Sequence, residues 1–539
     1  MTAQPDYEGV AVGTGFGGLY ALYLLKQLGL KVRGIESAPD VGGTWYWNRY
    51  PGARSDVTSD TYRYSNVFDN ELLLTHDWPH NYLTQPELQS YFQAVARKHE
   101  LYPLISFNSD LKAAHWDDED GFWKLEISTG EKFTTRYLVT SIGILHKPKI
   151  PDIPGLDTFK GQITHSSKWT PEIEWEGKRV AVIGSGASGV QLTSALAEKA
   201  KELTQFIRHA QYVLPAQLRP VSPDERKSIN DKYDKIWEDV WNSAVGFGFD
   251  EPARPALSVS AEERHKIFQD LWDQGSGFRF LFGGFSDLAT DEAANKEAIN
   301  FIHNKIKETV KDLKKAEVLL SNDWFARRPL TDDNYYERFN QDNVHAVDIT
   351  KNPIVSVVPE GIKTADGQLH EFDLIVFATG FDSVDGSYFR IDFRGLHNTS
   401  LPTHWSLGPH SHTGATTSLF PNLFFVNGPG VPFANNPPVT EESARFAADL
   451  IARAEEKRKD GSGRFKGIVE STQEADEKWL ETMRVVAGQT LFARTGSWFF
   501  GENVEGRVKS PRFYFGGIGN WRREMKRVKE EGYEGFVFR

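Results

Sequence analysis

Near the start of the chain, apolar and polar residues alternate in an order that predicts a strand, a helix and a second strand. Apolar side chains fill 10–12, leucines recur at helical spacing over 19–28, and another apolar strand follows at 32–35. The loop before the helix reads Gly-Thr-Gly-Phe-Gly-Gly from Gly13. This order is typical of a mononucleotide-binding unit, whose backbone N–H groups and helix N-terminus bind a pyrophosphate.

The same order returns farther along the chain. An apolar strand at 179–183 precedes Gly-Ser-Gly-Ala-Ser-Gly from Gly184, and a helical pattern over 190–196 leads to a strand at 203–207. One glycine triplet is weak evidence, but here both triplets stand between a strand and a helix. The fold class that follows is α/β, with two Rossmann-like dinucleotide-binding domains.

The residues that end the second strand of each unit predict different ligands. Glu36 lies about 20 residues after the first glycine, where a carboxylate binds ribose hydroxyls and repels a 2′-phosphate. Arg208 holds the equivalent place in the second unit, where a guanidinium pairs with a 2′-phosphate. We therefore expect FAD on the first loop and NADPH on the second. His209 either adds a donor to that phosphate or is a surface histidine, and an exposed strand-end arginine is the structural alternative for Arg208.

The rest of the chain changes pattern twice. Amphipathic helices with capping boxes such as Ser222/Glu225 predict a helical insertion over 221–322. Strand patterns then return and end in the buried run 374–377, and a tail rich in glycine and proline follows, with a helix at 442–458. The expected domains are an FAD-binding domain of 1–145 and 385–539, an NADP-binding domain of 150–220 and 323–384, and the insertion at 221–322.

Composition excludes several classes of protein. Acidic residues outnumber basic ones by 74 to 62, for a net charge of -12, which argues against nucleic acid as a partner. The absence of cysteine excludes disulfides, thiolate metal sites and dithiol redox centres, and we expect no metal site. No apolar run is long enough to span a membrane, and polar residues precede the first strand, so we expect a cytoplasmic protein. We also expect it to be a monomer.

Two stretches carry a resemblance to a known family. The anchor positions of a fingerprint before the second loop are Phe159, Gly161, His165 and Trp169, and an unbroken run of glycines and aromatics fills 42–56. On these motifs the chain resembles the type I Baeyer–Villiger monooxygenases, and among them the cyclohexanone monooxygenases, over almost its whole length. The family usually has Pro or Asp where Thr170 stands. We expect His165 to position the two nucleotide domains and not to act as a catalyst.

The resemblance implies roles for individual residues. Arg328 aligns with the catalytic arginine of the family, Asp56 with the carboxylate that holds it, and Arg327 with a residue that binds the NADPH phosphate. Trp498 resembles the tryptophan of a mobile loop that closes over the nicotinamide, although Glu505-Gly506-Arg507 replaces the usual Pro-Gly-Lys and the loss of proline predicts a looser loop. The residues expected to bind the cofactors are Gly13, Gly15, Phe16, Gly18, Glu36, Gly43, Thr44, Trp45, Trp47, Asp56, Tyr62, Gly184, Gly186, Ser188, Gly189, Arg208, His209, Arg327, Arg328, Ala378, Thr379, Gly380 and Trp498. The residues expected to face substrate are Ile144, Leu145, Phe433 and Phe513.

The implied activity is insertion of one oxygen atom from O2 beside the carbonyl of a cyclic or aliphatic ketone, through a C4a-peroxyflavin and with consumption of NADPH. The products would be lactones or esters. Two alternatives stay open at this point: an N- or S-oxygenating flavin monooxygenase, and a redox-sensing protein that holds both dinucleotides without catalysis.

Overall fold

The first apolar strand, β1 (Tyr7–Val12), lies inside a sheet, where it pairs in parallel with β2 (Val32–Ile35) and with β6 (Lys132–Thr140). The computed structural model describes residues 4–460 and 465–539. The last four residues of β1 are buried, as expected of a strand with neighbours on both edges. The expected FAD-binding segments include 1–3 and 461–464, which lie outside the described residues.

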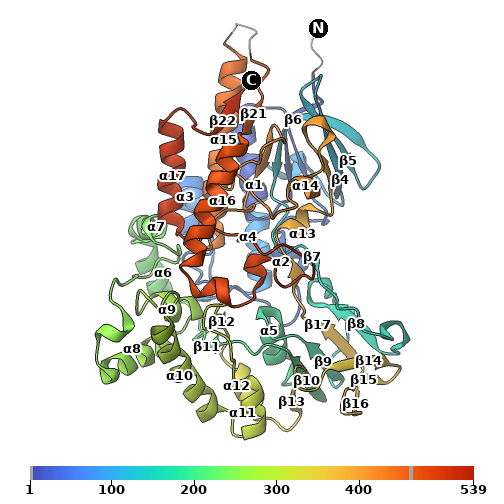
Figure 1. Ribbon diagram of the computed structural model, residues 1–539, viewed down its shortest axis with the longest axis vertical. Coiled ribbons are helices and arrows are strands. Elements are labelled where there is room, and N and C mark those ends of the chain that lie inside the picture. Colours follow the sequence, from blue (N-terminus) through green and yellow to red (C-terminus); the bar gives the residue numbers. More distant parts are fainter. Residues whose placement is uncertain (1–3, 461–464) are drawn as a thin grey trace.

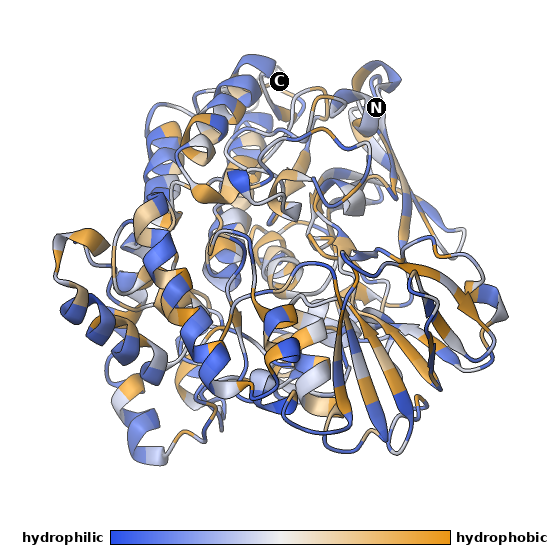
Figure 2. Ribbon diagram, turned by 60° about the horizontal axis from the view of Figure 1, so that its bottom comes forward, coloured by the Kyte–Doolittle hydropathy of each residue, from blue (hydrophilic) through white to orange (hydrophobic). Residues whose placement is uncertain are grey.

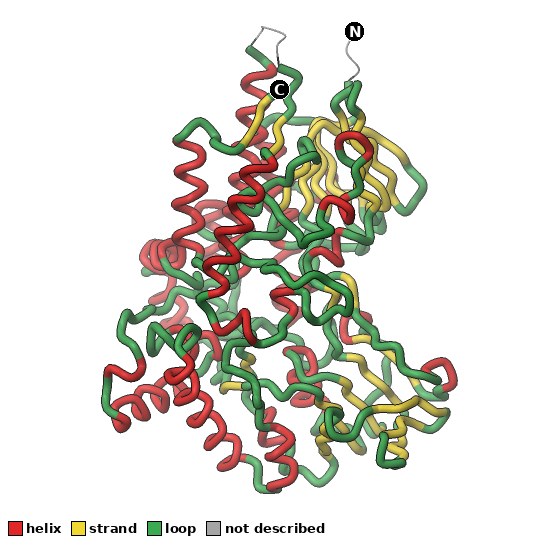
Figure 3. Tube along the Cα trace, in the orientation of Figure 1, coloured by secondary structure: helices red, strands yellow, loops and turns green. Residues whose placement is uncertain are grey.

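This sheet has eight strands, and two of them come from far along the chain. Strands β4 (Leu111–Asp117) and β5 (Phe122–Ile127) extend it beyond β6 as an antiparallel meander. Strand β19 (Asp392–Arg394) then joins β4, and β20 (Leu423–Phe425) joins β6. Both pairs are parallel, so the C-terminal part of the chain completes the sheet that the N-terminal part begins. Figures 1 and 3 show this sheet in the upper half of the molecule.

Helix α1 (Phe16–Gln27) follows the first glycine loop and packs against α15 (Asn436–Arg458). The apolar pattern placed the start of α15 at residue 442, six residues too late. Pro437 and Pro438 occupy its first turn, where proline is tolerated because the N–H groups there have no partner within the helix. A proline pair therefore marks the start of this helix and not an irregular loop.

The second sheet is entirely parallel. Its order is β13 (Val344–Asp348), β10 (Glu202–Ile207), β9 (Arg179–Ile183), β17 (Leu374–Phe377) and β8 (Gln162–His165). Helix α5 (Ala187–Leu196) follows its glycine loop. Two sheets, each with a strand–glycine loop–helix unit, confirm the α/β fold class. In Figure 1 the second sheet lies below the first.

Helices cover the side of the molecule away from the second sheet and contain the expected insertion (Figure 1). Ser222 caps its first helix by accepting from Glu225 N, but the Glu225 carboxylate pairs with Arg219, so only half of the predicted capping box forms. Figure 2 shows hydrophobic and hydrophilic residues alternating along these helices, as amphipathic packing requires. The helices of this region are α6 (Pro223–Asn230), α7 (Tyr233–Asn242), α8 (Ala261–Gln274), α9 (Gly277–Phe282), α10 (Glu292–Thr309) and α11 (Leu313–Leu319).

The remaining elements are short or peripheral. The other α-helices are α2 (Thr44–Trp47), α3 (Asn66–Thr75), α4 (Gln85–Lys98), α12 (Tyr335–Arg338), α13 (Asp385–Tyr388), α14 (Leu401–His404), α16 (Gln473–Gly488) and α17 (Ile518–Glu530). The other strands are β3 (Ile105–Ser106), β7 (Lys147–Pro148), β11 (Val213–Leu214), β12 (Leu330–Thr331), β14 (Ile354–Val358), β15 (Gly361–Thr364), β16 (Leu369–Glu371), β18 (Phe381–Asp382), β21 (Val469–Ser471) and β22 (Phe536–Phe538). Among the described residues, no helix is both long enough and apolar enough to cross a membrane.

Candidate active site

The first glycine loop is shaped by contacts that only glycine permits. Gly13 has a φ of +93°, and an added Cβ would lie 2.3 Å from the carbonyl oxygen of Ser141. A Cβ at Gly18 would lie 1.8 Å from the Gly13 carbonyl oxygen. Helix α1 therefore starts close to β1, with Gly15 as its N-cap and no acidic residue in its first turn. Such a helix start favours a pyrophosphate.

Glu36 is held rigidly at the end of β2. Its side chain is buried, one oxygen accepts from the backbone N–H and the hydroxyl of Thr14 at 2.8 Å, and the other accepts from Ala38 N at 2.7 Å. The carboxylate thus ties the glycine loop to the strand end. The same side chain lines the cavity that the loop opens into, where it can accept from a ribose hydroxyl.

That cavity is partly open to solvent, has about 1100 Å³ of empty space and runs past the start of α1. The expected cofactor residues that line it are Gly13, Gly15, Phe16, Glu36, Gly43, Thr44, Trp45, Trp47 and Tyr62. Leu145, expected to face substrate, also lines this cavity, together with His146, Lys168 and Arg390, which were not anticipated. Its length, its carboxylate at one end and its aromatic side chains at the other fit FAD.

Aromatic rings form one wall of the cavity. Tyr62 stands edge-on to Phe16 and to Trp45, with ring centroids 5.4 and 5.8 Å apart. Trp45 Nε1 donates to the Tyr62 hydroxyl at 3.2 Å, so both polar atoms have partners within a dry wall. Burial raises the pKa of the Tyr62 hydroxyl well above its usual range, which keeps it a neutral hydrogen-bonding group. Trp47 lies beneath the ammonium group of Lys168 at 5.0 Å.

The second glycine loop repeats the geometry of the first. Gly184 has a φ of +116°, and an added Cβ would lie 2.4 Å from the carbonyl oxygen of Ala378 at the end of β17. A Cβ at Gly189 would lie 2.3 Å from the Gly184 carbonyl oxygen. Gly186 caps α5, and a Cβ there would meet no atom within 4 Å. The start of α5 therefore faces open space that a second pyrophosphate fits.

Basic side chains gather beside this loop. Arg208 and His209 follow β10 and are exposed, and Arg327 reaches the same region from a distant segment. Burial lowers the pKa of Arg327 and the nearby Arg208 adds to that shift, while Asp323, with an oxygen 3.0 Å from Arg327 Nε, opposes it. Nη2 of Arg327 donates to the carbonyl oxygen of Thr495 at 2.6 Å. Cations this close together suit a ligand with a dianionic phosphate.

Lys149 belongs to the same basic group but was not anticipated from the sequence. Its pKa is lowered by burial first and then by the charge of Arg208. Its carbonyl accepts from the Thr379 hydroxyl at 2.5 Å, and its N–H donates to the carbonyl of Gly380 at 2.9 Å. Two lysines within 146–149 could have indicated an anion-binding site. The local sequence does not show that this segment lies beside the end of β17.

Arg328 and Asp56 form an ion pair that joins two distant segments. Nη2 and Nε of Arg328 donate to one oxygen of Asp56 at 2.6 and 3.0 Å. The guanidinium also lies over the ring of Phe278 at 5.6 Å. Burial opposes the charge of Arg328, but Asp56 outweighs it and raises the pKa of the guanidinium above its usual value. The structure therefore holds a permanent cation, 35% exposed, with an orienting carboxylate.

Aromatic side chains extend from Phe278 to the Trp498 segment. Phe433 lies within 6.5 Å of Phe278, centroid to centroid, and Phe513 stands edge-on to Trp498 at 5.5 Å. Both expected substrate-facing phenylalanines thus belong to one apolar wall near Arg328. Ile144 packs against the core, and its carbonyl accepts from Val384 N at 2.8 Å. Leu145 lines the first cavity, so the structure does not bring all four expected substrate residues to this wall.

The Trp498 segment is anchored by charge where the family has Pro-Gly-Lys. Arg507 donates to Asp382 at 2.8 Å and to Asp385 at 3.1 Å, and the buried Arg512 also pairs with Asp385. Asn503 donates to the carbonyl of Phe381 at 2.8 Å and accepts from the Lys149 ammonium group. We expected a looser segment from the missing proline, but ion pairs hold the segment in its place.

Two further contacts connect the nucleotide units. Tyr50, inside the glycine and aromatic run, donates to Gln191 of α5 at 2.8 Å although the residues are 141 positions apart. Burial raises its pKa to about 12, and a hydrogen bond with Ser188 opposes the shift. His165 is buried and contacts the carbonyl of Gly380 at 3.1 Å, a placement that suits a positioning residue.

Comparison with known proteins extends these observations to the whole chain. A family model described as flavin-binding monooxygenase-like matches residues 8–221. Phenazine N-monooxygenase of Lysobacter antibioticus is 44% identical over 535 residues, which cover 99% of this chain and 97% of that protein. Cyclohexanone 1,2-monooxygenase of Acinetobacter sp. is 42% identical, with the same coverage. The crystal structure of cyclohexanone monooxygenase from Rhodococcus sp. Phi1 bound to NADP+ matches with a TM-score of 0.96 and 44% identity, covering 99% of this chain and 100% of that one.

Proposed function

The chain belongs to the type I Baeyer–Villiger and related flavin monooxygenases, and we propose that its substrates are cyclic or aliphatic ketones, which it converts to lactones or esters. It is an FAD- and NADPH-dependent monooxygenase. Related proteins named for cyclohexanone, cyclopentanone and acetone support this class of substrate. We further propose molecular oxygen as co-substrate, and a monomer in the cytoplasm as the working form.

The observation that supports a ketone substrate is the Arg328–Asp56 pair. Attack on a carbonyl places negative charge on its oxygen, and a fixed cation in a partly dry pocket stabilises that charge. A guanidinium does not lose its proton in the working pH range, so Arg328 keeps its charge throughout. Asp56 fixes the direction of its N–H groups, and the aromatic wall at Phe278 and Phe433 excludes water beside it.

We assign FAD to the first glycine loop and NADPH to the second from the residues beside each loop. FAD, when bound, supplies the redox chemistry that activates oxygen. Thr14 and Glu36 would hold its adenosine end, and the wall of Trp45 and Tyr62 would lie along its ring system. Arg208, Arg327 and Lys149 would bind the 2′-phosphate of NADPH beside the start of α5, with His209 as a further donor.

N-oxygenation is the second candidate, because the phenazine N-monooxygenase is 44% identical to this chain over nearly its full length. An amine nitrogen is itself a nucleophile and develops no carbonyl oxyanion, so it has no need of a cation at Arg328. The Arg328–Asp56 pair is present in this chain, which favours a ketone substrate.

A substrate panel separates the two candidates. Purified FAD-loaded enzyme with NADPH and isotopically labelled oxygen gas is incubated with cyclohexanone, an acyclic ketone and phenazine. We expect lactone and ester products that carry one labelled oxygen atom, detected by mass. Only N-oxides, with every ketone unchanged, would replace the ketone proposal with N-oxygenation. Sedimentation analysis and cell fractionation test the monomer and the cytoplasmic location.

A further inference from the structure

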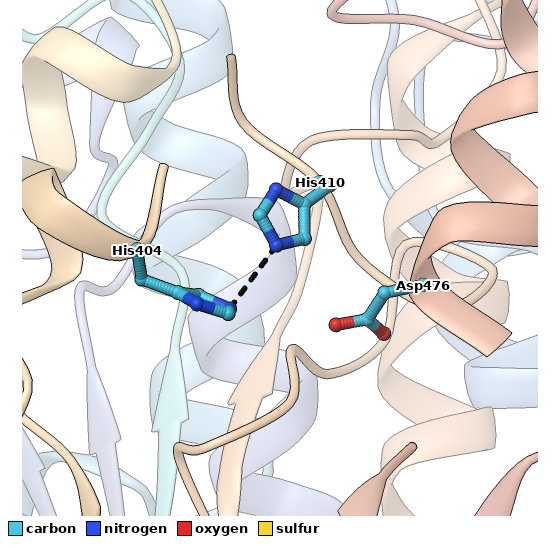
Figure 4. Close-up of side chains that lie close together, drawn as sticks. All are labelled: His404, His410 and Asp476. Carbon is cyan, nitrogen blue, oxygen red and sulfur yellow. Dashed lines mark hydrogen bonds between the residues drawn. The ribbon is translucent and has the colours of Figure 1, made fainter. Parts of the chain in front are cut away.

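Three potential metal ligands meet in the C-terminal part of the chain, and none of them lines the first cavity. His404 ends α14, His410 lies in the segment that follows, and Asp476 lies in the first turn of α16. One ligand atom from each of the three lies within 4.8 Å of the other two. Figure 4 shows the two rings side by side and the carboxylate next to them.

The two imidazoles already have the spacing that a shared metal requires. Their Nε2 atoms lie 3.1 Å apart. In a tetrahedral zinc site, bonds of about 2.0 to 2.1 Å place two nitrogen ligands roughly 3.3 Å apart. The Asp476 ligand atom lies within 4.8 Å of both nitrogens, so it has to move closer to share the same centre.

The ring of His410 is oriented as metal-bound histidines are. Its Nδ1 lies 3.1 Å from the carbonyl oxygen of Gly408, and a carbonyl only accepts, so the proton is on Nδ1. In the neutral ring the lone pair of Nε2 then points at His404. A metal-binding histidine usually donates its other N–H to a carbonyl or carboxylate in this way. When His404 binds through Nε2, the proton now on that atom moves to its Nδ1.

Asp476 is a fully buried carboxyl group in this cluster. Within residues 4–460 and 465–539 no Lys, Arg or His nitrogen comes within ion-pair distance of it. Ser418 N donates to Oδ2 at 2.7 Å and Thr417 Oγ1 at 3.2 Å. The hydroxyls of Ser418 and Ser471 lie near the carboxyl group, but neither they nor Oδ1 form a hydrogen bond of good geometry. A buried carboxylate oxygen without a donor is costly, and a divalent cation would satisfy it.

We propose that His404, His410 and Asp476 bind a divalent transition metal ion, with zinc as the best match, and that the ion clamps the start of α16 to the 404–410 segment. Two imidazoles and one carboxylate are a common zinc ligand set, and water or the Thr417 hydroxyl completes the tetrahedron. From the sequence we expected no metal. No recognised ligand spacing connects positions 404, 410 and 476, so only the fold reveals the cluster.

Zinc binding is measured on the full-length, FAD-loaded enzyme after removal of any affinity tag. A chelating dye competes for the ion, and elemental analysis after gel filtration gives the bound zinc per chain. We expect one zinc ion per chain and at least about tenfold weaker binding in His404→Gln and His410→Gln. Asp476→Asn keeps the shape of the side chain and should also weaken binding. His397→Gln is the matched control, because His397 lies nearby in sequence with a side chain that is 83% exposed.

Zinc should raise the unfolding midpoint of the parent enzyme and of His397→Gln, but not that of His404→Gln. NADPH oxidation and FAD content should stay unchanged in His404→Gln, because the cluster lies outside the active site. If a variant fails to fold, X-ray absorption at the zinc edge identifies the ligands in the parent enzyme. Two imidazole ligands and one carboxylate oxygen would support the proposal. Absence of stoichiometric zinc, or equal zinc affinity in parent and His404→Gln, overturns it.

Discussion

Nη2 of Arg328 donates to Oδ2 of Asp56 at 2.6 Å, although the two residues are 272 positions apart in the chain. Asp56 is the last residue of the glycine and aromatic run, whose first residues line the first cavity, and Arg328 precedes β12 in the segment that also supplies Arg327. The pair therefore joins the surroundings of one dinucleotide loop to those of the other. A cation fixed at this junction can stabilise negative charge that develops between the two cofactor sites.

Replacing Arg328 by Ala should remove oxygenation while leaving reduction of the flavin by NADPH intact. The variant lacks the cation that stabilises negative charge on the carbonyl oxygen. We therefore expect lactone formation to fall by about 100-fold or more. Arg328→Lys should be intermediate, because an ammonium keeps the charge but loses the planar fork. Stopped-flow absorbance follows flavin reduction, and mass spectrometry follows the product.

Arg279→Ala is the control for that experiment. Arg279 also lies over an aromatic ring, that of Phe249 at 5.2 Å, but it does not contact Asp56. Its loss should leave both half-reactions close to those of the parent. Unimpaired lactone formation in Arg328→Ala would show that the stabilising charge comes from elsewhere.

Asp56→Asn tests whether the carboxylate acts through Arg328. The amide keeps the size of the side chain but removes the charge that fixes the guanidinium, so oxygenation should fall roughly tenfold. In a double-mutant cycle, Asp56→Asn should cost little more once Arg328 is already Ala. Additive losses in the double variant would mean that Asp56 and Arg328 act independently.

The choice of NADPH over NADH should depend on Arg208 and Arg327. Loss of a charged hydrogen bond to phosphate is worth about 1.5 to 3 kcal/mol, so each Ala variant should raise the KM for NADPH by roughly 10- to 100-fold. The KM for NADH should hardly change, because that cofactor lacks the phosphate. Steady-state kinetics with both cofactors measures the ratio, and a parallel rise in both KM values would contradict the assignment.

Arg219→Ala provides the matched control, because the Arg219 side chain is exposed and pairs with Glu225 and a backbone carbonyl. His209→Gln decides the role that the sequence left open. A higher KM for NADPH alone identifies His209 as a phosphate donor, and unchanged kinetics make it a surface histidine.

Local patterns predicted the elements well, and long-range contacts account for what was missed. Strands β9 and β17 have the bounds that their sequence patterns indicated, because a buried parallel strand is apolar over most of its length. The partners of Tyr50 and Lys149 could not be predicted, since each contact joins segments that only the fold brings together. The roles of Arg328 and Asp56 came from family resemblance, and no local pattern indicated their pairing.

Arg507→Ala should loosen the Trp498 segment. Arg507 holds the segment to Asp382 and Asp385, so without it water should reach the site more often. We expect several-fold more hydrogen peroxide per NADPH consumed and faster proteolysis of the segment. Lys509→Ala is the control from the same segment, because Lys509 is largely exposed and pairs with Glu502. Equal peroxide yields in the two variants would rule out an anchoring role for Arg507.

The stability of the enzyme should depend on pH through Glu441. This residue of α15 is fully buried and accepts from the N–H and the hydroxyl of Ser65 at 2.6 and 2.7 Å. Burial raises its pKa to about 7, an effect only partly opposed by Arg445. The folded state therefore holds a proton that the unfolded state releases near pH 4.5. The contribution of Glu441 to the free energy of unfolding should fall by roughly 2 kcal/mol between pH 5 and 7.5.

Other groups titrate in that range with the opposite sign. Burial lowers the pKa of His146 and of His404 to about 4, and each costs stability as the pH falls below 6.5. The informative quantity is therefore the difference between parent and Glu441→Gln, because the amide stays neutral at every pH. Urea midpoints should favour the variant more at pH 7.5 than at pH 5. Glu456→Gln, at an exposed position of the same helix, should show no such trend, and a pH-independent difference for Glu441→Gln would mean that Glu441 titrates normally.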